Sequence, residues 1–208
     1  MAEVKSGRTG PSAGTIALVL AGLLALAAVG MTVFGSVADG TEAAEGNTAT
    51  PQGEGSSLQA TIEGLRERLR QDPDNDQGWF HLGLAYRESG RFAEAGQAFR
   101  RAMELRPQNA DYVAYLGESL LLQGGREPPP EAERLFRRAI ELEPGNPQAR
   151  YYLATLRDLR GDHRGALDEL VALLRDAPEG APWEPQVRNA AVTIAQANGI
   201  DISGRLPP

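Results

Sequence analysis

The sequence predicts an all-α protein in which three helix-turn-helix repeats stack into a solenoid behind one N-terminal transmembrane helix. Three observations predict this architecture. A long uncharged apolar segment lies near the N-terminus, apolar residues recur at helical spacing from Leu58 onward, and the later part of the chain repeats itself about every 34 residues. Helical units of this kind are stable only when they stack, so we expect one continuous helical array.

Composition excludes several classes of chemistry. The 208 residues contain no cysteine, which excludes disulfides, thiolate zinc sites, iron–sulfur ligation and a cysteine nucleophile. The net charge of −7 argues against nucleic-acid binding, which depends on a basic surface. No P-loop, nucleophile elbow or Ser/His/Asp set is present. We therefore expect no enzyme activity, no cofactor or metal, no nucleic-acid partner and no small-molecule substrate.

The first element has the length of a membrane span. Residues 9–38 carry no charge, and the 19 apolar residues from Ile16 to Phe34 would span roughly 28 Å as a helix, close to the thickness of a bilayer core. Basic residues precede this segment and acidic residues follow it. The positive-inside rule therefore predicts a cytoplasmic N-terminus at 1–14, a transmembrane helix at 15–37 and everything later across the membrane.

Two alternatives to a retained membrane anchor stay open at this point. Ser36-Val37-Ala38 resembles the cleavage site of a signal peptide, although the apolar run is longer than is usual for one. A buried core helix is the other reading, but the segment has no polar face to support it. Residues 38–56 hold no large apolar side chain and are rich in Gly, Thr and Glu. We therefore expect them to form a flexible linker.

The helical domain is expected over residues 57–199. Its leading helix carries Leu58, Ile62, Leu65 and Leu69, and three repeats follow at 76–109, 110–146 and 147–180, with a C-terminal helix at 183–198 and a tail at 200–208. The repeats match the tetratricopeptide pattern. The matching residues are Trp79, Leu82, Gly83, Tyr86, Ala95, Phe99, Ala102 and Pro107 in the first repeat; Leu116, Gly117, Ala132, Phe136, Ala139 and Pro144 in the second; and Leu153, Ala154, Ala166, Leu170, Leu173 and Pro178 in the third.

Each pattern position has a physical role. Small residues at positions 8, 20 and 27 of a repeat let its two helices approach closely, and large residues at positions 4, 7, 11 and 24 fill the space between them. Gly90, Gly124 and Gly161 recur at position 15 and are expected to end the first helix of each pair. The prolines at position 32 stop the second helix. Three extra residues in the second repeat lie in its inter-helix turn, where an insertion is tolerated.

The first helices of the repeats are expected to line a concave groove that binds a peptide or an amphipathic helix. Positions 2, 5, 9 and 12 lie opposite the packing positions, and position 6 lies on the flank. The alternative for the aromatic members, Phe80 and Tyr151 above all, is that they pack against a neighbouring helix. The groove candidates are Gln77, Phe80, His81, Leu84 and Arg87 in the first repeat; Asp111, Ala114, Tyr115, Glu118 and Leu121 in the second; and Gln148, Tyr151, Tyr152, Thr155 and Asp158 in the third.

Other candidate sites are weaker. His81 lies beside Trp79 and Phe80, where a groove or packing role is more usual than ligation of haem or a metal. His163 begins a helix and is expected at the surface. Paired carboxylates such as Glu141 and Glu143 are typical of acidic helix ends, which are solvated. The array therefore predicts a recognition surface rather than a reaction centre.

Features that flank the repeats carry a resemblance to a known family. They are the leading helix ATIEGLRERLRQDPDNDQGW, the long turn between ESLLLQGG and EAERLFRRAIELEPGNPQA, and the ending DAPEGAPWEPQVRNAAVTIA. In these features residues 58–199 resemble the periplasmic domain of the tetratricopeptide subunit of bacterial cytochrome c maturation, the CycH/CcmI-type protein. The resemblance implies a chaperone in the cytoplasmic membrane that holds the C-terminal helix of apocytochrome c in the periplasm and presents it to the other haem-ligation subunits.

The chain departs from that family in one respect. Family members commonly have two transmembrane spans before the periplasmic domain, whereas one span is predicted here. A shortened relative serving another system, such as haem attachment to a nitrite reductase, is therefore an alternative. A general tetratricopeptide scaffold for envelope assembly or secretion is a second one.

Overall fold

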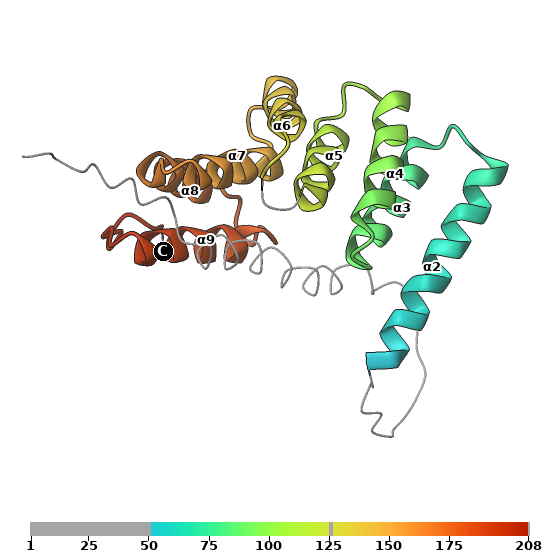
Figure 1. The fold of residues 1–208 in the computed structure, drawn as a ribbon, viewed down its shortest axis with the longest axis horizontal. Coiled ribbons are helices and arrows are strands. Elements are labelled where there is room, and N and C mark those ends of the chain that lie inside the picture. Colours follow the sequence, from blue (N-terminus) through green and yellow to red (C-terminus); the bar gives the residue numbers. More distant parts are fainter. Residues whose placement is uncertain (1–50, 125–126, 208) are drawn as a thin grey trace, which may run out of the picture. The chain divides into compact units, whose positions relative to one another are not determined.

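The computed structural model describes residues 51–124 and 127–207, with side chains from residue 57 onward. All of the regular secondary structure in these ranges is helical, so the expected all-α class is confirmed (Figure 1). The predicted membrane helix lies outside the described residues, and none of the helices within them combines the length and apolar character that a bilayer span requires. The helices are α2 (Pro51–Gln71), α3 (Asp76–Glu88), α4 (Phe92–Leu105), α5 (Ala110–Gln123), α6 (Pro130–Leu142), α7 (Pro147–Leu159), α8 (His163–Arg175) and α9 (Glu184–Ala197).

The start of α2 differs from the expectation of a flexible linker through residue 56. The helix begins at Pro51. Proline suits the first turn of a helix, because the N–H that it lacks would have no partner there. The absence of large apolar residues argues against tertiary packing of this segment but not against helix propagation, since each residue added to an existing helix gains a hydrogen bond.

The described chain forms two compact units, and the boundary between them falls within α7. The first unit contains α2 to α6 and α7 as far as Tyr152. The second contains the rest of α7 from Leu153, α8, α9 and the C-terminal tail. The third repeat, at 147–180, therefore belongs partly to each unit.

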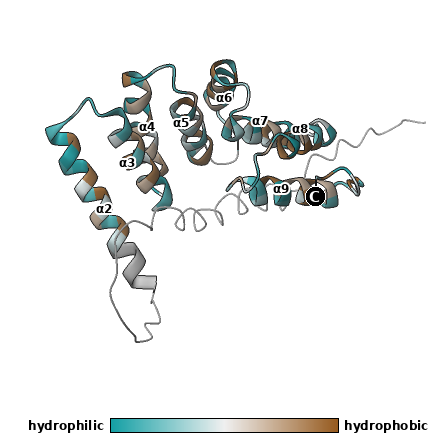
Figure 2. Ribbon diagram, turned by 180° about the vertical axis from the view of Figure 1, so that it is seen from behind, coloured by the Kyte–Doolittle hydropathy of each residue, from teal (hydrophilic) through white to brown (hydrophobic). Residues whose placement is uncertain are grey.

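In the first unit each helix packs on the next one along the chain, from α2 to α6 (Figure 1). Hydrophobic and hydrophilic residues alternate around the helices, as expected for amphipathic helices that bury one side (Figure 2). The core of the first repeat joins four helices. Its buried members are Ile62 and Leu69 of α2; Leu82, Ala85 and Tyr86 of α3; Ala95, Ala98 and Phe99 of α4; and Leu116 of α5.

Two glycines let the helices of a pair approach closely. A Cβ atom added at Gly83 of α3 would lie 2.4 Å from the Phe99 ring of α4, and one added at Gly117 of α5 would lie 2.9 Å from the Phe136 ring of α6. Both phenylalanines are fully buried. The small residue at position 8 is therefore required by the large residue at position 24.

An asparagine caps the first helix of every repeat. The side-chain oxygen of Asn75 accepts a hydrogen bond from the Gly78 amide at 2.7 Å at the start of α3. Asn109 and Asn146 do the same at 3.2 and 3.0 Å for α5 and α7. Each cap satisfies a backbone donor that would otherwise lack a partner.

Glycines end two of the first helices in the left-handed conformation. Gly90 after α3 has φ of 73° and Gly161 after α7 has φ of 87°. Gly124 also ends its helix, α5, but with φ of −70°. Here Pro129 of the long turn lies close to the Gly124 backbone, and a Cβ atom added at Gly124 would lie 2.6 Å from it. Glycine at position 15 is thus favoured by a positive φ in the first and third repeats, and by the close approach of Pro129 in the second.

In the second unit α8 packs against α9, and the tail is tied to both helices. The Arg205 guanidinium forms an ion pair with Asp168 of α8 at 2.5 Å. The Arg188 guanidinium of α9 donates a hydrogen bond to the Pro207 carbonyl at 2.9 Å. These contacts fix residues 200–207 on the surface of the second unit.

Candidate functional site on the A-helix face

The first helices of the repeats form one face of the first unit, here called the A-helix face, from α3, α5 and α7 up to Tyr152. The groove candidates divide there by exposure. Gln77, His81 and Asp111 are exposed, and Phe80, Leu84, Arg87, Tyr115 and Gln148 are half-buried. Gln77, His81 and Leu84 follow i, i+4, i+7 spacing and form a stripe along α3.

The remaining candidates correct the expectation of an open groove. Ala114, Glu118, Leu121, Tyr151 and Tyr152 of the first unit are buried, as are Thr155 and Asp158 of the second unit. Tyr152 stacks on Phe136 with ring centroids 5.1 Å apart. Asp158 is paired with the His163 ring at 2.6 Å, and this histidine, which the sequence predicted at the surface, is 32% exposed.

Aromatic side chains fill the space between α3 and α5. The Phe80 ring contacts the Phe99, Tyr112 and Tyr115 rings at centroid distances of 5.5, 4.9 and 5.2 Å. Such pairs add to the stabilisation that burial provides. Phe80 therefore packs against the neighbouring repeat, which was the alternative to a groove role, and its side chain is half-buried.

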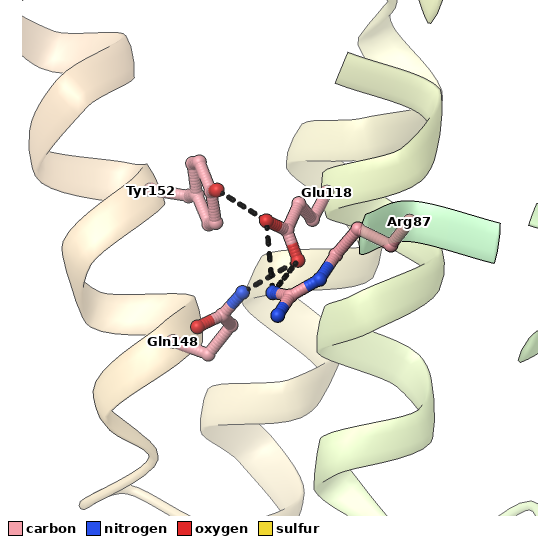
Figure 3. Close-up of polar contacts among 4 residues, drawn as sticks. All are labelled: Arg87, Glu118, Gln148 and Tyr152. Atoms are coloured by element: carbon pink, nitrogen blue, oxygen red, sulfur yellow. Dashed lines mark hydrogen bonds and ion pairs between the residues drawn. The ribbon is translucent and has the colours of Figure 1, made fainter. Parts of the chain in front are cut away.

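A polar network joins the three A helices at the centre of the face (Figure 3). The buried Glu118 carboxylate of α5 accepts hydrogen bonds from the Tyr152 hydroxyl and from the Gln148 amide, both of α7 and both at 2.7 Å. The Arg87 guanidinium of α3 lies 3.3 Å from the same carboxylate. The side chain of Arg87 is 30% exposed, compared with 7% for Glu118. One carboxylate thus holds three successive repeats in register.

Burial and charge shift the pKa values of this network. Burial alone lowers the pKa of Arg87, but the Glu118 carboxylate and the neighbouring tyrosines outweigh it, so the pKa of Arg87 is raised. Burial first, and then Glu118, raise the pKa of Tyr152 well above its usual range. Burial likewise raises the pKa of Tyr115, over whose ring Arg87 lies at 5.2 Å. Arg87 stays cationic and both tyrosines stay neutral at physiological pH.

A second set of polar contacts lies nearer the start of the A helices. The Tyr112 hydroxyl donates to the Asp76 carboxylate at 2.7 Å, and Arg106 approaches the same group at 3.1 Å. Asn146, which is fully buried, donates to Asp111 at 2.8 Å. Neither Tyr112 nor Asn146 is among the site residues predicted from the sequence. The recurrence of asparagine before each A helix was the available signal for Asn146.

The central polar groups of this face pair with one another. The polar groups at its centre are a carboxylate, a guanidinium, a phenol and an amide that satisfy one another. Within the described residues no cluster of three or more His, Asp or Glu side chains is placed to hold a metal ion. The groove candidates of this face that solvent reaches are the exposed Gln77, His81 and Asp111 and the half-buried Phe80, Leu84, Arg87, Tyr115 and Gln148.

The family model of the cytochrome c-type biogenesis protein H TPR domain matches residues 45–182, more than half of the chain. The chain belongs to this family. The resemblance drawn from the leading helix, the long turn and the ending is therefore confirmed. The family match also covers the whole A-helix face, from Asp76 to Tyr152.

Two curated relatives are cytochrome c-type biogenesis proteins named CycH. That of Bradyrhizobium diazoefficiens is 27% identical over 147 residues, which cover 69% of this chain and 40% of the relative. That of Pseudomonas aeruginosa is 30% identical over 125 residues, which cover 60% of this chain and 29% of the relative. The chain therefore spans less than half the length of either relative.

Among solved structures, the crystal structure of MamA is similar in fold. It superimposes with a TM-score of 0.52 and 17% sequence identity, covering 75% of this chain and 97% of MamA. At this level of identity the likeness concerns the helical repeat architecture alone.

Proposed function

We propose that this protein is a membrane-anchored chaperone of cytochrome c maturation, which holds the C-terminal helix of an apocytochrome c and presents it to the haem-ligation subunits. The observation that carries the proposal is the match of residues 45–182 to the TPR domain of a cytochrome c biogenesis family. The uncharged segment at 9–38, with basic residues before it and acidic residues after it, supports an anchor in the bacterial cytoplasmic membrane and a periplasmic helical domain.

The A-helix face supports a helical ligand. An amphipathic helix is recognised through apolar anchors spaced one turn apart, with polar contacts beside them. The α3 stripe of Gln77, His81 and Leu84 provides two polar side chains followed by one apolar side chain, next to the half-buried Phe80 ring. The Glu118 network makes this face rigid, so that little conformational entropy is lost when a ligand binds. The protein then acts by binding, without chemistry of its own.

The test is the binding of a fluorescent peptide that copies the C-terminal helix of an apocytochrome c from the same bacterium. We expect Leu84→Gln and His81→Ala to weaken binding, the former by about tenfold, because a buried apolar anchor contributes on the order of 1–2 kcal/mol. His81 is exposed, so its replacement does not threaten folding. Glu141→Ala, at an exposed position of α6, is the matched control. Unchanged affinity in both α3 variants would place the site elsewhere.

A further inference from the structure

A pocket of about 560 Å³ opens between α2, α3 and α4, away from the α3 stripe. Its floor comes from α3, where Trp79, Leu82 and Tyr86 line it. On a helical wheel these three residues lie about 180° from the stripe that contains His81. The pocket and the A-helix face are therefore separate surfaces of the same repeat.

The floor of the pocket is aromatic and held in place. The Trp79 indole N–H donates to the Pro73 carbonyl at 2.9 Å, which fixes the ring. The Arg91 guanidinium lies over the Tyr86 ring, 4.6 Å from the ring centroid, in a cation–π contact. Rings that are already positioned offer a large apolar contact at a low entropic cost.

A small residue on α4 accounts for the open space. Ala98 lines the pocket at position 23 of the first repeat. The second repeat has Leu135 at the same position, and that side chain packs against the core of the first repeat. At this position the first repeat has only the methyl group of Ala98, where the second repeat has the larger side chain of Leu135.

The rim of the pocket is basic, although the whole chain is acidic. Arg66, Arg70 and Arg101 line it together with a single carboxylate, that of Glu94, whereas the net charge of the chain is −7. Arg101 pairs with Asp74 and Glu104, and Arg70 pairs with Glu67. These three acidic side chains are 54–79% exposed, and such surface pairs contribute little. Arg66 makes no ion pair in the part of the chain that the structure describes. Incoming carboxylates can therefore take these arginines as partners.

We propose that this pocket is a second docking site, for a helix of a partner protein that presents one large apolar side chain flanked by acidic residues one turn away. The walls are two helices, α2 and α4, as in grooves that accept a third helix. The aromatic floor suits the apolar side chain, and the arginine rim suits the carboxylates. The chaperone would thus hold a second protein while its A-helix face holds the first.

The experiment uses the full chain with Trp183→Phe, which leaves Trp79 as the one tryptophan of the sequence. The probe is a capped helical peptide of about 16 residues with one Phe and Glu on either side one turn away. Its controls carry Lys in place of Glu, or Ser in place of Phe. Titration of Trp79 fluorescence should show saturable binding of the Glu peptide and at least tenfold weaker binding of both controls. The affinity should fall as salt rises.

Two kinds of variant locate the site. Ala98→Leu copies the second repeat and should fill the pocket, and the exposed Arg66→Glu reverses one rim charge without touching the core. Each should weaken binding of the Glu peptide at least tenfold, while His81→Ala on the opposite face leaves it unchanged. Equal binding of the Glu and Lys peptides, or full binding by both pocket variants, would overturn the proposal. So would Arg66-dependent binding to phosphatidylglycerol vesicles without any binding of the peptide.

Discussion

At the scale of single residues, Glu118 is the side chain on which the A-helix face depends. A carboxylate is costly to bury unless hydrogen bonds and an opposite charge compensate it. Here Tyr152 and Gln148 donate to it and Arg87 supplies the charge. Because the three partners come from two other repeats, the compensation also fixes how the repeats pack. The same contacts explain why a residue expected in an open groove is buried.

Replacing Glu118 by glutamine should therefore destabilise the protein. Glu118→Gln keeps the shape but leaves the half-buried Arg87 cation without its counter-charge, and we expect a loss of about 1–3 kcal/mol in the free energy of unfolding. Glu67→Gln is the control, since the Glu67–Arg70 pair is exposed and should contribute no more than about 0.5 kcal/mol. Urea denaturation followed by circular dichroism measures both. Similar losses for the two variants would show that the network is not structural.

Tyr112 should make stability fall at high pH. Burial first, and then the hydrogen bond to Asp76, raise the pKa of Tyr112 to about 12. The neutral phenol is thus favoured in the folded state, and its contribution is complete below pH ~10 and lost as pH rises towards the folded pKa. The single lysine and the four other tyrosines of the sequence are present in both proteins, so the comparison with Tyr112→Phe isolates this one phenol. Between pH 9 and 11.5 the unfolding free energy of Tyr112→Phe should fall less than that of the wild type. Parallel curves would contradict this assignment.

At the scale of the elements, the first two repeats each depend on a glycine in one helix facing a phenylalanine in the other. Gly83 and Phe99 form this contact in the first repeat, and Gly117 and Phe136 form it in the second. A tightly packed interface cannot absorb an added methyl group without moving a ring or a helix. Helix propensity alone would favour alanine at both glycines, so their presence reflects packing.

Alanine at Gly83 should consequently be destabilising although alanine is the better helix former. The added Cβ would lie 2.4 Å from the Phe99 ring, and we expect a loss of about 1–3 kcal/mol. Gly64 of α2 provides the matched control, because no atom lies within 4 Å of a Cβ added there. Gly64→Ala should stabilise the protein by about 0.5–1 kcal/mol. Equal stabilisation by both changes in thermal unfolding would contradict the packing argument.

The repeat pattern predicted the helices well and the accessible site poorly. Positions such as those of Gly83, Phe99 and Pro107 determine contacts within one repeat, so a single sequence contains the information needed to place them. Accessibility on the A-helix face depends on contacts between repeats. Leu84 and Glu118 occupy the same position in successive repeats, yet one is half-exposed and the other is buried under side chains of α3 and α7. The exposure of such a residue depends on the neighbouring repeats, so it cannot be predicted from the sequence of one repeat.

At the scale of the whole molecule, the family assignment and the geometry lead to one view of the protein. The match to the TPR domain of a cytochrome c-type biogenesis family fits the chaperone role proposed above, and the sequence has no cysteine that could form a mixed disulfide with a substrate thiol. The two surfaces of the first repeat extend this view. The A-helix face is proposed for the substrate, and the basic pocket between α2 and α4 is proposed for a second protein.

The most direct test is the affinity of the purified full chain for the C-terminal helix of an apocytochrome c, compared with a scrambled peptide of the same composition. The proposed chaperone role predicts that the native peptide binds at least about tenfold more tightly, a difference of about 1.4 kcal/mol. Scrambling keeps charge and apolar content but destroys the stripe that a helix presents. Equal affinity for the two peptides would contradict the chaperone role.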